Sequence, residues 1–499
     1  MTAVNYIQNI PFFSIFLAIF GGIVTPILGN GKTAQKVNLV IVTVIGILSA
    51  VLLVHLWQRE ESFTFMMGRF PAPWGNELRA GPLEALLALC FCLVMALTLT
   101  GGSRFLQKDV LPEKQNLYFT MIYLLLGSML TLIYTNDIFT AYVFLEINTI
   151  AFCAIIMAKG SGESIVATLH YLVICLLGSG LFLIGISLLY SITGHLLMEN
   201  IQQAILDLVQ TGEYAFVFAV VIGMIIIGIS VKSAVFPFHF MLVSAHSVAT
   251  PASSGILSGL VLKSFIFLNI KMFYCVFTID LIRSLKITNV LFVFGLMGMV
   301  VGSISALKER RIKHMLAYSS AAQIGYIYMG LGLGNHEGMV AACFHILAHA
   351  ITKAMLCICA GGLIEASEGN VGINSLRGAG HRNLVAGIGF TVGGLSMIGI
   401  PLTAGFISKL YFATATIYSP QKMVITLLTL AISMILNAMY FIPSAIAIWS
   451  PVDKKAKIPK PSRAMQYAIG IFIVLNVVLG IYYAPIIDMI EIGIQLLES

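Results

Sequence analysis

The chain has 499 residues, of which 59% are hydrophobic and only 10% are charged, and its mean hydropathy is +0.97. So apolar a composition excludes a soluble globular protein and is typical of a polytopic membrane protein. The net charge of +7 needs no nucleic-acid partner, because short basic runs in such a chain face the anionic surface of the bilayer.

Fourteen apolar stretches follow one another along the chain, and most are long enough to cross a hydrocarbon core of about 30 Å as helices. A membrane barrel would instead show alternating strands of about ten residues. The predicted fold is therefore all-α and polytopic, with about fourteen transmembrane helices. The stretches are 11–28, 37–57, 82–100, 117–134, 138–157, 168–190, 215–236, 253–274, 289–307, 313–333, 339–363, 384–416, 423–449 and 464–488.

Two polar connections are long enough to form structure of their own. The segment 58–81 contains Pro-Ala-Pro-Trp-Gly, which favours turns, and its flanks are expected to pair as a hairpin at the outer surface. The segment 194–214 has apolar residues at helical spacing and is predicted to be an interfacial helix. We expect neither segment to carry chemistry. No removable signal peptide is expected, since no basic region precedes the first apolar run.

Proline interrupts the seventh and the twelfth stretch near their middles. Pro237 and Pro401 each remove a backbone donor, so each helix is expected to break there. Lys232 lies five residues before Pro237, and Lys409 lies eight residues after Pro401. The prolines are five spans apart, and paired broken helices predict two inverted repeats with an ion site near the midplane. Ordinary proline kinks are the alternative interpretation.

These repeats divide one predicted membrane domain, 1–499, into four parts. Residues 1–116 hold helices one to three, and 117–274 form a first five-helix repeat. Residues 289–449 form the second repeat, and 464–499 hold helix fourteen and the C-terminus.

The Lys and Arg residues of the loops predict the orientation. Loops on one face hold seventeen basic residues, and the opposite face, with both termini, holds seven. The richer face is therefore predicted to be cytoplasmic, with both termini on the outer face of the cell (inner) membrane. By this count, only four of the 28 basic residues lie inside the membrane: Lys232, Lys263, Lys353 and Lys409.

Glu146 joins these four lysines as a fifth ionisable residue inside an apolar stretch. Without internal partners, five such charges would cost about 12–17 kcal/mol, so they indicate an ion pathway. A desolvated lysine can release and regain a proton. Glu146 and Lys232 are the natural pair, because a nearby carboxylate holds the lysine charged and its withdrawal lets the proton move on.

His345, His349 and Lys353 recur every four residues and are expected to line one helix face over about 12 Å, which suits proton hopping. No carboxylate stands between the two histidines as in a zinc hydrolase, and the eight cysteines lack metal-site spacing. The sequence thus predicts no metal, no cofactor and no redox centre of its own. Four further residues would either hold water in the path or make ordinary hydrogen bonds between helices: His239, His246, Ser319 and Ser320.

Several strings in the chain resemble one family. They are Lys232 with FPFH (236–239) and Ala245-His246, SGLVLK ending at Lys263, LAYSS (316–320) with GY (325–326), HILAHAITKA (345–354), and GIPLTAGFISK ending at Lys409. Together, from about Leu117 to Tyr440, they resemble the antiporter-like subunits of respiratory complex I, membrane-bound hydrogenases and Mrp-type cation/proton antiporters. The string at Lys263 looks closer to the hydrogenase-type and Mrp D-type members than to the larger complex I subunit with its long lateral helix.

The resemblance implies a fourteen-helix core with two inverted five-helix repeats and broken helices seven and twelve. It also implies that the buried residues pass protons, with uptake from the cytoplasm in the first repeat and release to the outside at Lys409. The implied partners are homologous antiporter-like subunits and small membrane subunits in the same bilayer, with any Na⁺ carried by neighbouring subunits. The host would be an Mrp-type antiporter or an oxidoreductase of the NADH:quinone or hydrogenase type.

One string departs from the family. Its members commonly have Trp-Leu-Pro-Asp-Ala-His after the first break, whereas this chain has Met241-Leu242-Val243-Ser244 before Ala245-His246. The proline and the acid are missing, so we expect that half-channel to differ in detail.

Two other functions fit the sequence less well. A standalone secondary transporter for a small solute would usually have twelve helices and a basic Gly-x-x-x-Asp-type loop between helices two and three, where this chain has QREESFTFMMGRFPAPWG. A haem-bearing oxidoreductase would need histidines paired across helices. The sequence favours protons over sodium, because sodium prefers oxygen ligands and the buried residues include one carboxylate.

Overall fold

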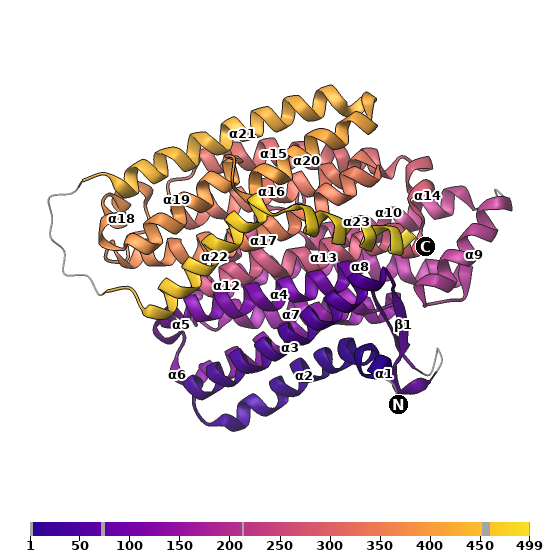
Figure 1. Ribbon diagram of the computed structural model, residues 1–499, viewed down its shortest axis with the longest axis horizontal. Helices are drawn as coiled ribbons and strands as arrows, with labels where there is room; N and C mark the ends of the chain where they lie inside the picture. The colour runs from indigo at the N-terminus through magenta and orange to yellow at the C-terminus, as the bar shows by residue number, and fades with distance from the viewer. Residues whose placement is uncertain (1–2, 71–74, 212–213, 452–459, 499) are drawn as a thin grey trace.

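Helices that run roughly along one direction make up nearly all of the computed structural model, which describes residues 3–70, 75–211, 214–451 and 460–498 (Figure 1). Within these described ranges, twelve helical segments are long and apolar enough to span a membrane. They are α2 (Ile10–Val24) with η1 (Thr25–Leu28), α3 (Gly31–Arg59), α4 (Pro82–Gly101), α6 (Pro112–Tyr134), α7 (Ile138–Met157), α8 (Gly162–Thr193), α10 (Ala215–Lys232), the run α12 (Pro251–Ile256), η3 (Leu257–Val261), α13 (Leu262–Lys271) and η4 (Met272–Val276), α15 (Ile287–Lys308), α17 (His336–Glu365), α21 (Pro420–Trp449) and α22 (Arg463–Ile481).

Two more helical segments lie where the sequence predicts spans. α16 (Ile312–Leu333) is buried along most of its length and packs between α15 and α17. α19 (Leu384–Ile398) and α20 (Ala404–Ala415) are separated by a break around Pro401. The prediction of a mostly helical polytopic membrane protein is confirmed.

The last predicted stretch, 464–488, differs from the structure. α22 ends at Ile481, and a separate helix, α23 (Ala484–Glu498), begins just before Pro485, whose ring cannot continue the preceding helix. α23 is amphipathic and buries Ile490 and Ile494 while packing against α4 and α17. The end of the chain therefore lies along the bundle instead of extending α22.

Both predicted polar connections form the expected structures. Strands β1 (Phe63–Met66) and β2 (Glu77–Ala80) pair antiparallel, with Phe63 opposite Ala80, and residues 71–74 of the turn lie outside the described residues. α9 (Met198–Thr211) buries Ile201 and Ile205 on one face. The remaining short elements are α1 (Ala3–Gln8), η2 (Met67–Arg69), α5 (Ser103–Asp109), α11 (Phe240–Val248), α14 (Ile279–Ser284), η5 (Ile373–Leu376), α18 (Ala379–Arg382) and η6 (Thr416–Tyr418).

The run Pro251–Val276 and the helix α17 form the centre of the bundle. Their most apolar windows are completely buried by the surrounding helices. Beside them α15 and α16 touch backbone to backbone, since a Cβ added to Gly325 would lie 2.5 Å from Met299 N. Polar side chains on these central elements are therefore shielded from lipid on every side.

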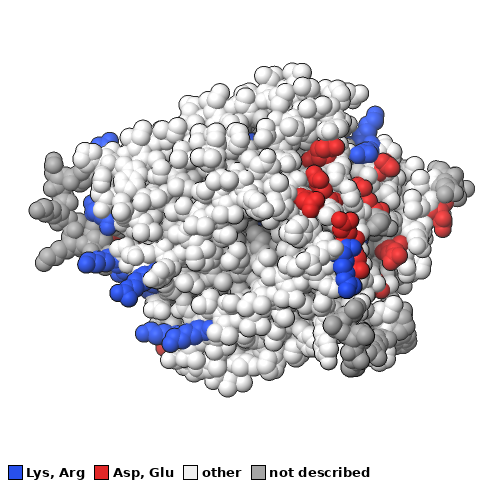
Figure 2. Space-filling view, viewed as in Figure 1, with Lys and Arg blue, Asp and Glu red and all other residues white. Residues whose placement is uncertain are grey.

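Charge is distributed unevenly between the two ends of the bundle. Basic side chains gather at the end where α5 and α18 lie, and acidic side chains gather at the end that holds both termini (Figures 1 and 2). We call these the basic end and the acidic end.

Candidate functional site

Glu146 and Lys232 form an ion pair between α7 and α10. The Lys232 ammonium is completely buried and donates to Glu146 Oε1 at 2.9 Å and to Thr149 Oγ1 at 2.8 Å. Glu146 and Thr149 are three residues apart, so both leave the same face of α7. The Glu146 side chain is 20% exposed and that of Lys232 is 0% exposed, so the carboxylate lies at the edge of the site. The two residues predicted to pair are in contact.

A cluster of buried polar side chains holds the helix break after Lys232. α10 ends at Lys232 and α11 begins at Phe240. Ser233 Oγ lies 2.6 Å from Tyr328 Oη, and Asn269 Nδ2 donates to Tyr328 Oη at 3.0 Å and to Ser230 Oγ at 3.1 Å. The cluster ties the end of α10 to α13 and α16. Its members were not predicted from the sequence, although two serines three residues apart at the end of an apolar run are a usable signal.

Lys263 and Lys353 lie in the centre of the bundle and are connected through two serines. Lys263 Nζ donates to Ser258 O, a carbonyl of the π-helical turn η3. Ser258 Oγ lies 2.6 Å from Ser320 Oγ, while Ser320 Oγ and Lys353 Nζ both donate to Leu316 O, at 3.0 and 2.9 Å. π-Helical turns are frequent at functional sites, because they free backbone groups for other partners.

The histidine stripe predicted on α17 is present and faces α16 and α20. The rings of His345 and His349 stack with centroids 5.7 Å apart, and Tyr326 stacks on His345 at 5.6 Å. His345 Nδ1 lies 2.5 Å from Ser408 Oγ. Both ring nitrogens of His349, and Nε2 of His345, have no hydrogen-bond partner among the described residues. Since buried polar groups are usually satisfied by protein or ordered water, these nitrogens make the stripe suitable for bridging water.

Lys409 lies at the second helix break. Its Nζ donates to Met397 O, in the last turn of α19, at 2.6 Å and lies 5.4 Å from the centre of the Tyr326 ring. The carbonyl end of a helix and the face of an aromatic ring both favour a cation. Unlike Lys232, Lys409 has no carboxylate in an ion pair with it within the part of the chain that the structure describes.

The supporting candidates fall at different places along this site. Ser320 lies between the two central lysines, and Ser319 is buried beside the Tyr440 hydroxyl, which donates to Asn437 near Lys409. His239 is only half-buried beside the first break and stacks on Phe236 at 5.8 Å. His246 is 2% exposed on α11, toward the basic end.

The expectation that only four basic residues are buried is wrong, because Lys271 is 0% exposed. By the sequence count it belongs to a loop, but the helical run continues through η4 to Val276 and encloses it. Lys271 Nζ donates to the carbonyls of Ile133, at 3.0 Å, and Thr135, which lie at the end of α6. It therefore caps the carbonyl end of that helix.

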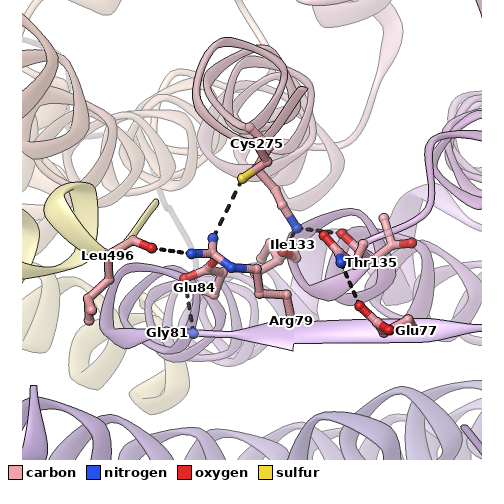
Figure 3. A network of polar contacts seen from close by, with 10 residues as sticks. Glu77, Arg79, Gly81, Glu84, Ile133, Thr135, Cys275 and Leu496 are labelled. Carbon is pink, nitrogen blue, oxygen red and sulfur yellow. Dashed lines mark hydrogen bonds and ion pairs between the residues drawn. The ribbon is translucent and has the colours of Figure 1, made fainter. Parts of the chain in front are cut away.

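A second polar network, around the predicted hairpin, adjoins Lys271 at the acidic end, because Leu78 of β2 pairs with Thr135 (Figure 3). Arg79 of β2 lies 3.6 Å from the buried carboxylate of Glu84, donates to Leu496 O of α23, and lies 3.5 Å from Cys275 Sγ. The hairpin thus carries buried charge, which the sequence analysis did not predict. The contacts join β2, α4, η4 and the C-terminal helix.

Replacing Lys271 tests whether a buried lysine matters here for stability alone. Lys271→Met should lower the thermal midpoint of the purified protein by several degrees, because two carbonyls lose a donor, at about 1–3 kcal/mol for an unsatisfied buried group. Proton movement per assembled complex should stay near the unsubstituted rate, because Lys271 contacts none of the five residues described above. The midpoint and the rate are measured on the same preparation, and a large loss of rate at an unchanged midpoint would contradict this assignment.

Comparison with known proteins places these residues in a family context. A model of the family described as "NADH:quinone oxidoreductase/Mrp antiporter, TM" matches residues 135–435, which include every ionisable residue of the site. NADH-quinone oxidoreductase subunit N of Desulforudis audaxviator is 31% identical over 395 residues, covering 79% of this chain and 76% of that protein. The D-type subunit of a Na⁺/H⁺ antiporter from Bacillus subtilis is 25% identical over 453 residues, covering 89% and 88%.

Two solved structures share the fold over nearly the whole chain. A chain of the membrane-bound sulfane sulfur reductase, an archaeal respiratory membrane complex, superposes with a TM-score of 0.86 at 25% identity and covers 98% of both chains. A chain of the Mrp complex from Dietzia sp. superposes with a TM-score of 0.83 at 19% identity and covers 100% of both. The second likeness is one of fold alone.

Proposed function

Because this chain belongs to the NADH:quinone oxidoreductase/Mrp antiporter family of membrane subunits, we propose that it is a proton-translocating, antiporter-like subunit of a multi-subunit energy-converting complex. The observation that carries the proposal is the row of buried ionisable side chains from Glu146 and Lys232 to Lys409. The relatives and the structural neighbours reported above are subunits or chains of complexes. This favours a subunit over a standalone carrier of a small solute.

Protons move along this row by exchange between neighbouring groups. The Ser258 carbonyl positions the Lys263 amine and the Leu316 carbonyl positions that of Lys353, while the hydroxyls of Ser258 and Ser320 between them would hold the water that passes the proton. From Lys353 the histidine stripe leads on to His345 and Ser408, next to Lys409. Each transfer leaves a neutral amine or imidazole behind, so no two neighbouring groups need to be charged at once. Two adjacent positive charges would be costly in this low-dielectric interior.

The step between Lys232 and Lys263 is the switch of the pathway. The Phe265 ring of α13, in the centre of the bundle, lies 5.9 Å from Lys232 Nζ. While Glu146 is in contact, the ammonium form of Lys232 is stabilised; when the carboxylate withdraws, the proton is free to continue through water. A neighbouring subunit that moves Glu146 would therefore control the flow of protons.

The fold is proposed to consist of two inverted five-helix repeats, 117–274 and 289–449, within a fourteen-helix domain over 1–499. The breaks at Pro237 and Pro401 support it, because each lies near a buried lysine. The basic end is proposed to face the cytoplasm of a cell membrane and both termini to lie outside, as the gathering of Lys and Arg at one end supports (Figure 2). Neighbouring antiporter-like and small subunits complete the complex, and one of them carries any sodium.

The proposal is tested by purifying the complex that contains this chain and measuring proton movement into liposomes with a pH-sensitive dye. The substitution Lys263→Ala should slow proton movement at least about tenfold, equal to about 1.4 kcal/mol of barrier, while the complex still assembles. Lys36→Ala is the matched control, since Lys36 is exposed on α3 and should be dispensable. If the wild-type complex moves no protons, or if Lys263→Ala moves them at the control rate, the proposal fails.

A further inference from the structure

Two cavities lie in series at the basic end of the bundle. The outer cavity, of about 510 Å³, reaches the surface at the exposed residues Lys108 and Glu368. Its lining also includes the ionisable residues Asp109, Lys159 and Glu365. The inner cavity, of about 10 Å³, lies where α11, α12, α16 and α17 meet. Lys313, at the start of α16, lines both cavities, so it forms the boundary between them.

The inner cavity has the size and the polar lining for about one water molecule. A water needs roughly 10–15 Å³ and two to four polar partners. His246 lines the cavity with its Nε2 unpartnered and its side chain 2% exposed. Ser254 also lines it, and Lys313, whose Nζ donates to Ala249 O at 2.9 Å, closes its outer side. These groups supply both donors and acceptors for such a water.

The inner cavity adjoins the row of buried ionisable residues at Lys353. Leu316 lines the cavity, and its carbonyl accepts from Lys353 Nζ at 2.9 Å. The titratable groups that act on His246 are all basic: Lys353, Lys313, Lys263 and His314. The next proton acceptor inward from His246 is therefore a lysine of the proposed pathway.

We propose that Lys313 and His246 take up a second proton from the basic end in each cycle of the Glu146–Lys232 switch and deliver it to Lys353, in the second half of the chain, without passage through that pair. The inference rests on the proposed function. The Lys313 ammonium gives its proton to the cavity water, and that water gives a proton to His246 Nε2, from which a proton passes to the neutral Lys353 amine. The neutral Lys313 amine then takes a proton from a hydronium ion in the outer cavity, which is left as water, so that each cycle moves one proton inward by this route.

This route differs from the one that the family resemblance implies, because uptake begins at Lys313 in the second repeat, and only His246 belongs to the first. It also explains how the site works without the acid that the family has before Ala245-His246. Lys313, from another helix, supplies the proton to His246 instead. The acids Asp109, Glu365 and Glu368 line the outer cavity, where their negative charge attracts cations toward the Lys313 amine.

Two substitutions of Lys313 distinguish a residue that passes protons from one that only supports the structure. One keeps the contacts of the side chain, and the other loses them. Lys313→Arg keeps the positive charge and a donor for Ala249 O, but arginine does not release its proton in proteins. We expect both Lys313→Arg and Lys313→Met to slow proton movement from the basic side at least tenfold in the reconstituted complex. Lys108→Met, in the same outer cavity but away from the inner one, should keep the wild-type rate. Full activity of Lys313→Arg would show a supporting role and overturn the proposal.

Two measurements that do not depend on Lys313 transport rates complete the test. In Lys313→Cys, a membrane-impermeant thiol reagent should label the new cysteine from the basic side and not from the acidic side, against a background of eight buried native cysteines. Imidazole added to His246→Gly should restore at least part of the lost rate. Labelling from the acidic side, or no labelling, overturns the route.

If Lys232→Ala abolishes transport in the same assay while the Lys313 and His246 variants are normal, only this inference fails. If none of the variants has an effect, the proposed function fails.

Discussion

Lys232→Ala is expected to reduce proton movement by the assembled complex to the level of empty liposomes. The lysine is completely enclosed, pairs with Glu146 at 2.9 Å, and ends the first half of a broken helix, so no other amine in the described residues can replace it at this point. The rate is measured with a pH-sensitive dye on reconstituted complex, after the amount of assembled complex has been equalised. The loss should be at least about tenfold, corresponding to about 1.4 kcal/mol or more in barrier height.

Lys232→Met and two variants of Glu146 show whether charge or volume is responsible. Methionine fills most of the space of the lysine side chain, so it should assemble at least as well as alanine and be equally inactive. Glu146→Ala should be comparably damaging, and Glu146→Asp milder, because a shorter carboxylate still attracts the ammonium across a longer gap. Wild-type pumping by Lys232→Ala, or equal wild-type activity of both Glu146 variants, would reduce this ion pair to a structural contact.

Most of the fold could be predicted from hydropathy alone. Backbone groups in lipid must be satisfied within a segment, so an apolar stretch of the right length has one common solution, the helix. The ends of helices were harder to predict. The helix α23 begins just before Pro485, after an apolar run. Its apolar face is covered by α4 and α17. No periodicity in the stretch 464–488 indicates where those two helices lie.

The residues of the candidate site likewise include some that the sequence predicts and some that it does not. A lysine well inside an apolar stretch can be identified without a structure, as Lys263 shows, because only burial is consistent with its neighbours. Lys271 lies near the end of the same stretch, where a loop and a buried helix end have the same composition. The partners of a buried charge come from distant parts of the chain, as Tyr328 does at the break after Lys232, and a single sequence does not encode which helix faces which.

Lys313 falls between the residues that the sequence predicts for the site and those that it does not. In the sequence it belongs to a basic run that signals orientation, and its neighbours Arg310 and Arg311 are exposed, as such a signal requires. In the structure the first turn of α16 brings the Lys313 amine between two cavities. A topology signal and a functional group can therefore occupy one short run.

The second large effect is expected from Lys409→Ala, which should also abolish net proton movement while leaving the Glu146–Lys232 pair intact. Lys409 is 5% exposed and lies at the end of the histidine stripe, where Ser408 contacts His345 Nδ1 at 2.5 Å. Without its amine, a proton that reaches His345 has no acceptor at the second break. The same dye assay applies, and assembly should be normal, because Lys409 leaves no carboxylate unpaired when it is removed.

Lys422→Ala is the matched control for Lys409, because the two lysines make the same kinds of contact. Lys422 Nζ donates to one backbone carbonyl, Gly332 O at 2.7 Å, and lies 5.1 Å from the centre of one aromatic ring, Phe292. Lys409 likewise has one carbonyl and one ring, but it adjoins the histidine stripe and Lys422 does not. If anchoring between helices were the role of Lys409, both variants would lose stability to a similar extent and neither would lose transport selectively. A selective loss in Lys409→Ala would mean that its amine acts by passing the proton on.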